Sequence, residues 1–225
     1  MSSLVKNHIS IQSRTDFCPA FSLEVKTSYH YKPADVAYEY CVEWRHRRCQ
    51  VIACPWLTER IEAGVVSYAA AVRELFGALH VPELHWRLEW LIKSYNGSFW
   101  LNTEHEYNTR LLLRSVGYQA WRNPRFFAAL YLFGSNSGLL KRAWNACMPG
   151  GFEPVFMVMR GVSEHDYALI QAAKALMCGG LGLTLYDLAD REVVDDVALQ
   201  LVVNALLIAN YGADVLKLGG TEITY

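Results

Sequence analysis

A nearly uninterrupted apolar run close to the C-terminus limits the folds that this chain can adopt. Residues 197–209 contain only two polar side chains, Gln200 and Asn204. The run is shorter than the roughly 20 apolar residues that span a bilayer, so it predicts a buried helix instead of a membrane span. A helix that is apolar on most faces must be surrounded by other elements. We therefore expect a central core helix that begins near residue 187 or 191 and ends at Tyr211.

The overall composition indicates a folded, globular chain. Hydrophobic residues make up 52% of the 225 residues and charged residues 19%, which is far from the composition of disordered proteins. The length is compatible with a single domain over residues 1–225, and we expect one. The first residues lack the continuous apolar segment of a secretory signal. The expected location is therefore cytoplasmic, with no membrane partner.

Several other segments have patterns that predict secondary structure. Apolar residues at helical spacing predict helices over residues 34–49, 57–76 and 84–95. Ser163, with Asp166 three residues later, resembles an N-cap and opens a helix that reaches Cys178. Alternating polar and apolar residues predict a half-buried strand over residues 21–31. Residues 1–20 and the short apolar run 155–159 remain undetermined.

The middle of the chain predicts a ribbon followed by two helices. Residues 108–122 are rich in β-forming residues and lack a helical period, which indicates a strand or ribbon. Pro124 suits the first turn of a short helix. Residues 134–138 form a turn, with Ser137 as a possible cap of a second helix over 139–148. The expected fold is mainly α (α+β): a helical body with a short ribbon-helix-helix-like element over residues 108–148.

The cysteines and histidines do not have the spacing of a metal site. His46, Cys49 and Cys54 are three and five residues apart, with no second ligand pair downstream. We expect no metal and no cofactor. In a chain of this size without an export signal, cysteines are usually reduced. The free thiols expected on this ground are Cys41, Cys49, Cys54, Cys147 and Cys178.

The usual signatures of catalysis are missing from the sequence. His80, His85 and His105 do not share one helical face, and no HExxH or GxSxG motif occurs. The glycine pairs are not followed by the Lys-Ser or Lys-Thr of a phosphate-binding loop. The paired acids at 187, 190, 195 and 196 precede the long apolar helix, where they suit the positive end of its dipole. We therefore expect a protein that is not an enzyme.

One region carries only positive charge. No acidic residue occurs between Glu106 and Glu153, although the net charge of the chain is −1. Solvated faces often carry such runs, but this many uncompensated cations produce a local positive field. The cations in this gap are Arg110, Arg114, Arg122, Arg125, Lys141 and Arg142.

The spacing of the arginines in the expected ribbon indicates contact with DNA. Arg110, Arg114 and Arg122 would lie on one face of an uninterrupted strand. A two-stranded ribbon fits the major groove, where arginine is the commonest side chain that reads guanine. A bulge at Gly117 would exchange the faces beyond it and bring Gln119 to the side of Arg114. We expect Arg125, Lys141 and Arg142 to contact phosphates.

The segment YQAWRNPRFFAALYLFGSNSGLLKRAWNACM resembles the ribbon-helix-helix DNA-binding motif. The resemblance implies that two chains pair their strands into one antiparallel ribbon, so that the protein is a homodimer bound to double-stranded DNA. It places Gln119 and Arg122 on the ribbon and Ser137 at the phosphate-binding start of the second helix. The segment FSLEVKTSYHYKP, which contains residues 21–31, is the alternative location of such a ribbon.

Four separate segments are similar to AcaB-like proteins of conjugative plasmids and integrating conjugative elements. They are VPELHWRLEWL, NPRFFAALYLFGSNSGLLKR, LGLTLYD and YGADVLKLGGT. The similarity implies a sequence-specific DNA-binding transcriptional regulator that activates conjugative-transfer genes. The alternative is a non-enzymatic protein-interaction component of a plasmid or mobile-element apparatus, because interfaces between proteins are also rich in aromatic residues and arginine.

Overall fold

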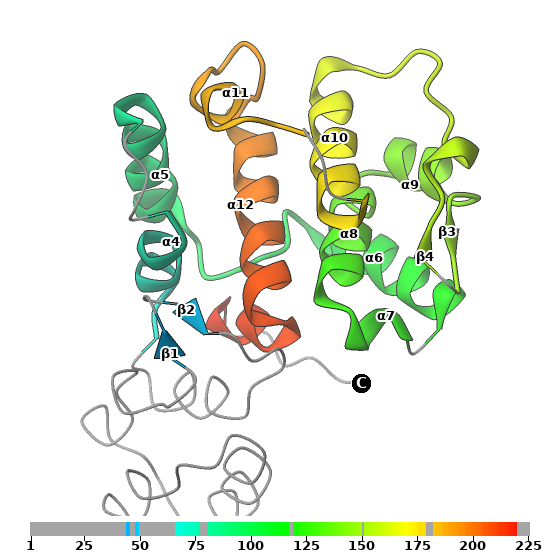
Figure 1. Ribbon diagram of the computed structural model, residues 1–225, viewed down its shortest axis with the longest axis horizontal. Coiled ribbons are helices and arrows are strands. Elements are labelled where there is room, and N and C mark those ends of the chain that lie inside the picture. The colour runs from blue at the N-terminus through cyan, green and yellow to red at the C-terminus, as the bar shows by residue number, and fades with distance from the viewer. Residues whose placement is uncertain are drawn as a thin grey trace, which may run out of the picture.

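The computed structural model describes residues 44–45, 48–49, 66–76, 81–117, 119–149, 151–178 and 182–219. The described part is mostly helical, as expected. Figure 1 shows α12 (Asp196–Tyr211) in the middle of the helical body. On one side lie α4 (Tyr68–Phe76) and α5 (Pro82–Ser94), and on the other lie α8 (Pro124–Phe133) and α10 (Glu164–Cys178).

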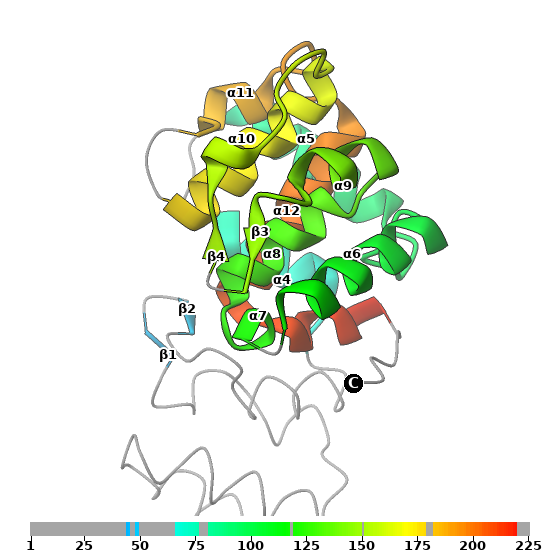
Figure 2. The same ribbon diagram turned by 90° about the vertical axis from the view of Figure 1, so that its right-hand side faces the viewer.

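The remaining elements are shorter or more peripheral. They are α6 (Thr103–Val116), α7 (Gln119–Arg122), α9 (Ser137–Ala143), α11 (Leu185–Ala189), η3 (Pro154–Phe156), η4 (Ala213–Gly219), β1 (Trp44–Arg45), β2 (Arg48–Cys49), β3 (Cys147–Met148) and β4 (Gly151–Phe152). Both small sheets are antiparallel hairpins, β1 with β2 and β3 with β4. Figure 2 shows β3 and β4 on an outer face and α7 at one end of the helical body.

The core forms around α8 and α12. Every residue of α8 except Arg125 is buried, and α8 packs against α6, α10 and α12. The expected core helix in the apolar run is confirmed as α12, but its expected start near residue 187 or 191 is wrong. The helix starts at Asp196 and is capped by the Asp195 side chain. Asn204 in the middle of α12 is fully buried. None of the helices in the described ranges combines the length and apolar character needed to cross a membrane.

The strand expected over residues 108–122 is wrong, because residues 108–116 belong to α6 and residues 119–122 form α7. The Asn102 side chain accepts a hydrogen bond from the His105 backbone N–H at 2.8 Å and caps α6. The residues that α6 buries are His105, Asn108, Thr109, Leu112, Leu113 and Val116. Their spacing is helical, but the first three are polar, so a search for apolar periodicity starting at residue 108 misses the helix.

Two further expectations are corrected at helix ends. The second helix of the expected motif was predicted to reach residue 148, but it stops at Ala143. Cys147 pairs with Phe152 in a hairpin instead. The helix expected over residues 34–49 is wrong at its end, where Trp44 pairs with Cys49. The apolar period that predicted this helix ends at Trp44, so nothing favours a helix beyond it. The expected strand over 21–31 lies outside the described residues.

The packing of α6 against the end of α8 explains one glycine. A Cβ added at Gly134 would lie 2.8 Å from the backbone nitrogen of Thr109, closer than real Cβ contacts. Glycine therefore allows the C-terminus of α8 to approach α6, in a place where any side chain would separate the two helices. Because Thr109 is itself fully buried, it has no room to move away.

A cap substitution tests the helical structure of α6. We expect Asn102→Ala to lower the free energy of unfolding by about 1 kcal/mol, because it leaves the His105 N–H without its acceptor at the helix start. Urea denaturation followed by far-UV circular dichroism measures this loss. A control is Asn96→Ala, which removes a hydrogen bond to Ser98 in the loop before α6. Equal effects of the two substitutions would contradict a capping role for Asn102.

Candidate nucleic-acid interface

Three arginines gather where α6, α7 and α8 meet. Arg114 is in the last turn of α6, Arg122 ends α7, and Arg125 is in the first turn of α8. All three are exposed. These helices contact one another, so the arginines lie on one end of the helical body. We call Arg114, Arg122 and Arg125 the basic corner.

The local backbone explains how the chain turns twice within this corner. Gly117 ends α6 with a φ of 83°, a value that favours glycine. Asn123 then starts α8, because its side chain accepts a hydrogen bond from the Phe126 N–H at 3.2 Å. Pro124 occupies the first helical position, where its missing N–H costs nothing. Two sharp turns in eight residues thus bring the helix ends together.

Arg114 and Arg125 lie in positive surroundings. The first turn of α8 contains no acid, and Arg125 adds a positive charge to the positive end of that helix. Arg114 and Arg125 form no ion pair with any residue of the described ranges. No Asp or Glu occurs in the sequence between Glu106 and Glu153. An anion such as a DNA phosphate would therefore be attracted to this surface.

The other cations proposed from the sequence have different surroundings. Arg110 is half-buried and bonds to Glu106 at 2.8 Å across one helical turn. The Arg142 guanidinium donates to the backbone carbonyls of Val158, Arg160 and Gly161, so it holds the loop before α10. Lys141 is exposed on α9. The structure thus groups Arg114, Arg122 and Arg125 and assigns a structural contact to Arg142.

The two polar residues expected at the interface lie at the starts of α7 and α9. Gln119 is the first residue of α7, and its side chain is outside the described part of the molecule. Ser137 is exposed at the start of α9, but it is not the cap of that helix. Asn136 is the cap, because its side chain accepts from the Leu139 N–H at 2.8 Å. The sequence carried this signal, since asparagine is as good an N-cap as serine.

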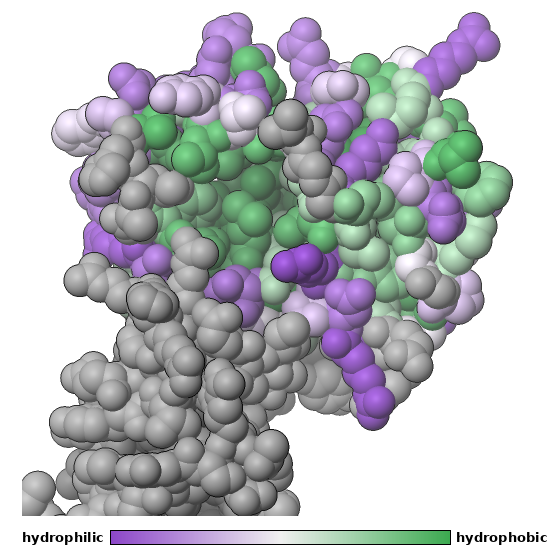
Figure 3. Space-filling view, viewed as in Figure 1, coloured by the Kyte–Doolittle hydropathy of each residue, from purple (hydrophilic) through white to green (hydrophobic). Residues whose placement is uncertain are grey.

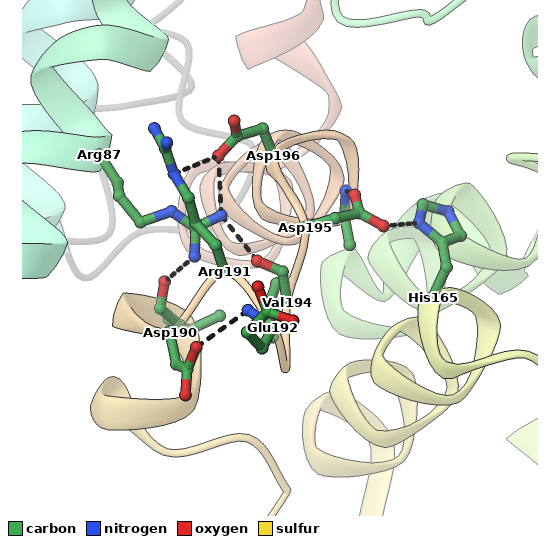
Figure 4. A network of polar contacts seen from close by, with 10 residues as sticks. Arg87, His165, Asp190, Arg191, Glu192, Val194, Asp195 and Asp196 are labelled. Atoms are coloured by element: carbon green, nitrogen blue, oxygen red, sulfur yellow. Dashed lines mark hydrogen bonds and ion pairs between the residues drawn. The ribbon is translucent and has the colours of Figure 1, made fainter.

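A second polar network joins α5 to the segment between α11 and α12. Figure 4 shows Arg87 reaching this segment from α5. Its guanidinium donates to the backbone carbonyls of Leu188 at 2.7 Å and Val194 at 2.6 Å, and it bonds to Asp196 at 2.9 Å. Arg87 is buried. Because every bond joins elements distant in sequence, the network fixes α5 against α11 and α12.

The acids before α12 are structural, as their positions in the sequence indicated. Asp187 forms a reciprocal capping box with Thr184 at the start of α11. Asp195 caps α12 and bonds to His165 of α10 at 2.6 Å. Partial burial alone would raise the pKa of the Asp195 carboxyl, but the hydrogen bonds from Ala198 and His165 outweigh it and hold the pKa below its ordinary value.

The described ranges contain no metal cluster. No group of three or more His, Cys, Asp or Glu side chains there could hold a metal ion. His165 bonds to Asp195, but within the same ranges no hydroxyl or thiol bonds to His165. Cys147 is a buried free thiol and Cys178 an exposed one. Cys41 and Cys54 lie outside the described residues, and Cys49 is in β2.

Two surface hollows lie away from the basic corner. A groove of about 240 Å³ between α4 and α5 has an apolar floor and a rim formed by His85 and by the Arg73–Glu89 ion pair. Figure 3 shows hydrophobic side chains on a hollowed face over these helices and α12. A wider hollow of about 570 Å³ beside α10 carries Glu164, Asp187 and Glu192. Its acidic lining does not suit nucleic acid.

Comparison of this chain with protein-family models, with curated proteins and with solved structures finds no match.

Proposed function

We propose that this protein is a DNA-binding transcriptional regulator, an activator of conjugative-transfer genes, that contacts duplex phosphates through the basic corner. The observation that carries the proposal is the gathering of three exposed arginines, without a neighbouring acid in sequence, at one end of the helical body. Exposed cations on one face are the usual electrostatic feature of DNA-binding proteins. The similarity of four segments to AcaB-like regulators supports the class of target genes.

The helical structure of residues 108–116 and 119–122 changes how this region would contact DNA. Without a strand there, Arg110, Arg114 and Arg122 do not form a row that enters the major groove as a ribbon would. Phosphate contacts position a protein on the duplex but do not read its sequence. Sequence specificity therefore enters this proposal through the alternative ribbon at residues 21–31, which lies outside the described residues.

Neutral substitutions at the basic corner test the phosphate contacts. We expect Arg122→Gln and Arg125→Gln each to weaken binding to a mixed-sequence duplex of about 30 base pairs, a typical upper site length. Each should also reduce the slope of log affinity against log salt by about one, because one fewer counterion is released. Fluorescence anisotropy between about 50 and 200 mM salt measures both quantities.

The matched control is Arg160→Gln, which removes the same charge from an exposed position before α10. The start of α10 and α7 lie toward opposite ends of the helical body in Figures 1 and 2. We expect this variant to keep the salt slope of the wild type. An equal loss in all three variants would indicate a response to net charge alone and would remove the basic corner from the proposal.

A second candidate function is protein interaction, and one surface segment favours it. Five large hydrophobic side chains are exposed within residues 144–158, with the exposed fraction reaching 79% at Val155. Arg142 holds the end of this segment through backbone carbonyls. Exposed apolar patches commonly bind partner proteins. The five side chains are Trp144, Met148, Val155, Phe156 and Val158.

The two candidates respond differently to one pair of variants. If DNA regulation is the function, the double variant that carries Arg122→Gln and Arg125→Gln should lower expression from a conjugative-transfer promoter fused to a reporter. Val155→Ser with Phe156→Ser should then leave expression unchanged. The reverse result, with DNA affinity unaffected by the serine variant, would support protein interaction.

A further inference from the structure

The outward face of α5 presents two tryptophans that the described part of the chain leaves exposed. Trp86 is 75% exposed and Trp90 is 50% exposed. They are four residues apart, so they lie next to each other on the same side of the helix. Single exposed apolar residues are common on protein surfaces, whereas an adjacent pair of the largest aromatic side chain marks a contact surface. Figure 1 shows α5 at the edge of the helical body.

The other sides of α5 are already used by the fold. Leu84, Leu88 and Leu91 are buried, and Arg87 reaches the segment before α12. Glu83 and Lys93 are exposed, like the two tryptophans. At about 100° per residue, these four side chains fall within roughly 80° of one another around the helix axis. We call Glu83, Trp86, Trp90 and Lys93 the α5 stripe.

The α5 stripe is symmetric in position and complementary in charge. Trp86 and Trp90 are each two residues from Leu88, and Glu83 and Lys93 are each five residues from it. Suppose that two copies of this helix pack antiparallel about a two-fold axis that crosses them at the level of Leu88. Each residue of one copy then meets the residue of the other copy that lies at the same sequence distance on the other side of Leu88. Trp86 then faces Trp90 of the other copy, and Glu83 faces Lys93.

We propose that a second copy of this chain docks on the α5 stripe in an antiparallel arrangement, which gives a two-fold symmetric dimer. The charges select the direction. A parallel arrangement would place Glu83 against Glu83 and Lys93 against Lys93, and like charges in contact disfavour it. This interface is separate from the basic corner and does not depend on the proposed function. It also takes the place of the ribbon that was expected to form the dimer at residues 108–122.

The size of the stripe sets the expected strength of the dimer. A tryptophan that becomes fully covered buries about 150 to 250 Å². Trp86 and Trp90 are already partly covered by the fold, so the pair supplies well under half of the roughly 800 Å² that each partner contributes to a standard interface. The dimer should therefore dissociate on dilution. Sedimentation velocity of the full chain without DNA, from about 1 to 200 µM, covers the matching range of affinities. We expect the wild type to pass from monomer to dimer within it.

Substitution of the tryptophans tests the contact. Trp86→Ser with Trp90→Ser should be monomeric at every concentration, because the apolar centre of the interface is lost. The control is Trp144→Ser, which changes a tryptophan that is 41% exposed at the end of α9 and should leave dimerisation unchanged. Circular dichroism establishes that each variant is folded. A monomeric wild type over the whole range, or a folded double variant that still dimerises, would overturn the proposal.

A charge exchange tests the antiparallel direction. Glu83→Lys alone, and Lys93→Glu alone, should each weaken the dimer about tenfold, equivalent to about 1.4 kcal/mol, because like charges then face each other. The variant that carries both changes should recover the affinity of the wild type, since the pairs are again opposite in sign. Glu164→Lys, which changes an acid in the first turn of α10, is the control. Single variants without effect, or no recovery in the exchanged variant, would contradict the antiparallel pairing.

Discussion

Asn204→Leu is expected to lower the free energy of unfolding by roughly 3 kcal/mol, because it leaves buried polar groups without partners. The Asn204 side chain is fully buried in α12. It accepts a hydrogen bond from the Tyr68 hydroxyl at 2.8 Å and donates to the Phe99 carbonyl at 3.3 Å and to the Tyr131 hydroxyl at 3.1 Å. One amide thus joins α4, α8 and the loop before α6 to the central helix.

Asn210→Leu provides the matched control on the same helix. The Asn210 side-chain nitrogen is buried and has no hydrogen-bond partner in the described part of the chain. Replacing that amide by an apolar group leaves no partner of this nitrogen unsatisfied, so stability should stay the same or rise. Urea denaturation of the wild type and both variants measures the difference. Equal losses for the two substitutions would show that the polar network around Asn204 has no special role.

Acidification is expected to destabilise the fold through His105 before the carboxylates titrate. His105 is fully buried in α6, and desolvation lowers its pKa to about 4, although its bond to the Tyr131 carbonyl opposes this. The Leu101 backbone N–H donates to Nδ1 at 3.2 Å, so in the neutral ring Nε2 carries the proton and donates to the Tyr131 carbonyl at 2.9 Å. The folded state therefore holds a neutral imidazole.

The sign of the pH dependence follows from this neutral state. Below the ordinary pKa of about 6.5, the unfolded chain binds a proton at His105 that the folded chain does not bind. Stability is complete above pH 6.5 and falls by about 1.4 kcal/mol per pH unit toward pH 4, for a total of roughly 3 kcal/mol. Asp195 has a lowered pKa, and its contribution to stability is lost only as the pH falls below the ordinary aspartate value near 3.9.

Urea denaturation at several pH values between about 7 and 4 measures this loss. His105→Gln should keep a donor toward the Tyr131 carbonyl and remove most of the slope between pH 6.5 and 4. His85→Gln, which changes an exposed histidine of α5, should keep the wild-type slope. If His105→Gln retains the full slope as well, the proton uptake occurs elsewhere in the molecule.

The sequence predicts best those elements in which apolar residues carry the helical period. The core helix α12, the helix α5 after Pro82 and the short helix α8 after Pro124 were expected from this pattern and are confirmed. The start of α10 is confirmed too, because the Ser163 hydroxyl accepts from the Asp166 N–H at 3.1 Å. Local signals determine these elements.

The sequence predicts poorly where buried positions are polar. His105, Asn108 and Thr109 hold core positions of α6 because each finds a place among tertiary neighbours. His105 bonds to Tyr131, for example, 26 residues away. No single-sequence pattern shows such partners, and the β-forming residues that follow then favour a strand.

The candidate site was identified in part. The sequence indicates the region of the basic corner, because no acidic residue occurs between Glu106 and Glu153. The sequence could not separate the exposed Arg114 and Arg125 from Arg110 and Arg142. Arg110 finds Glu106 one helical turn away only if α6 is a helix, and Arg142 finds carbonyls up to 19 residues away. The α5 stripe was missed, since exposure decides it and exposure depends on the packing of α5.

The most direct test of DNA binding at the basic corner is backbone hydrogen exchange of the full chain with and without a mixed-sequence duplex of about 30 base pairs. We predict that DNA slows exchange at the end of α6, in α7 and in the first turn of α8, and that the change is lost in the variant combining Arg114→Gln, Arg122→Gln and Arg125→Gln. Unchanged exchange in these segments, while DNA is bound, would contradict the proposed interface.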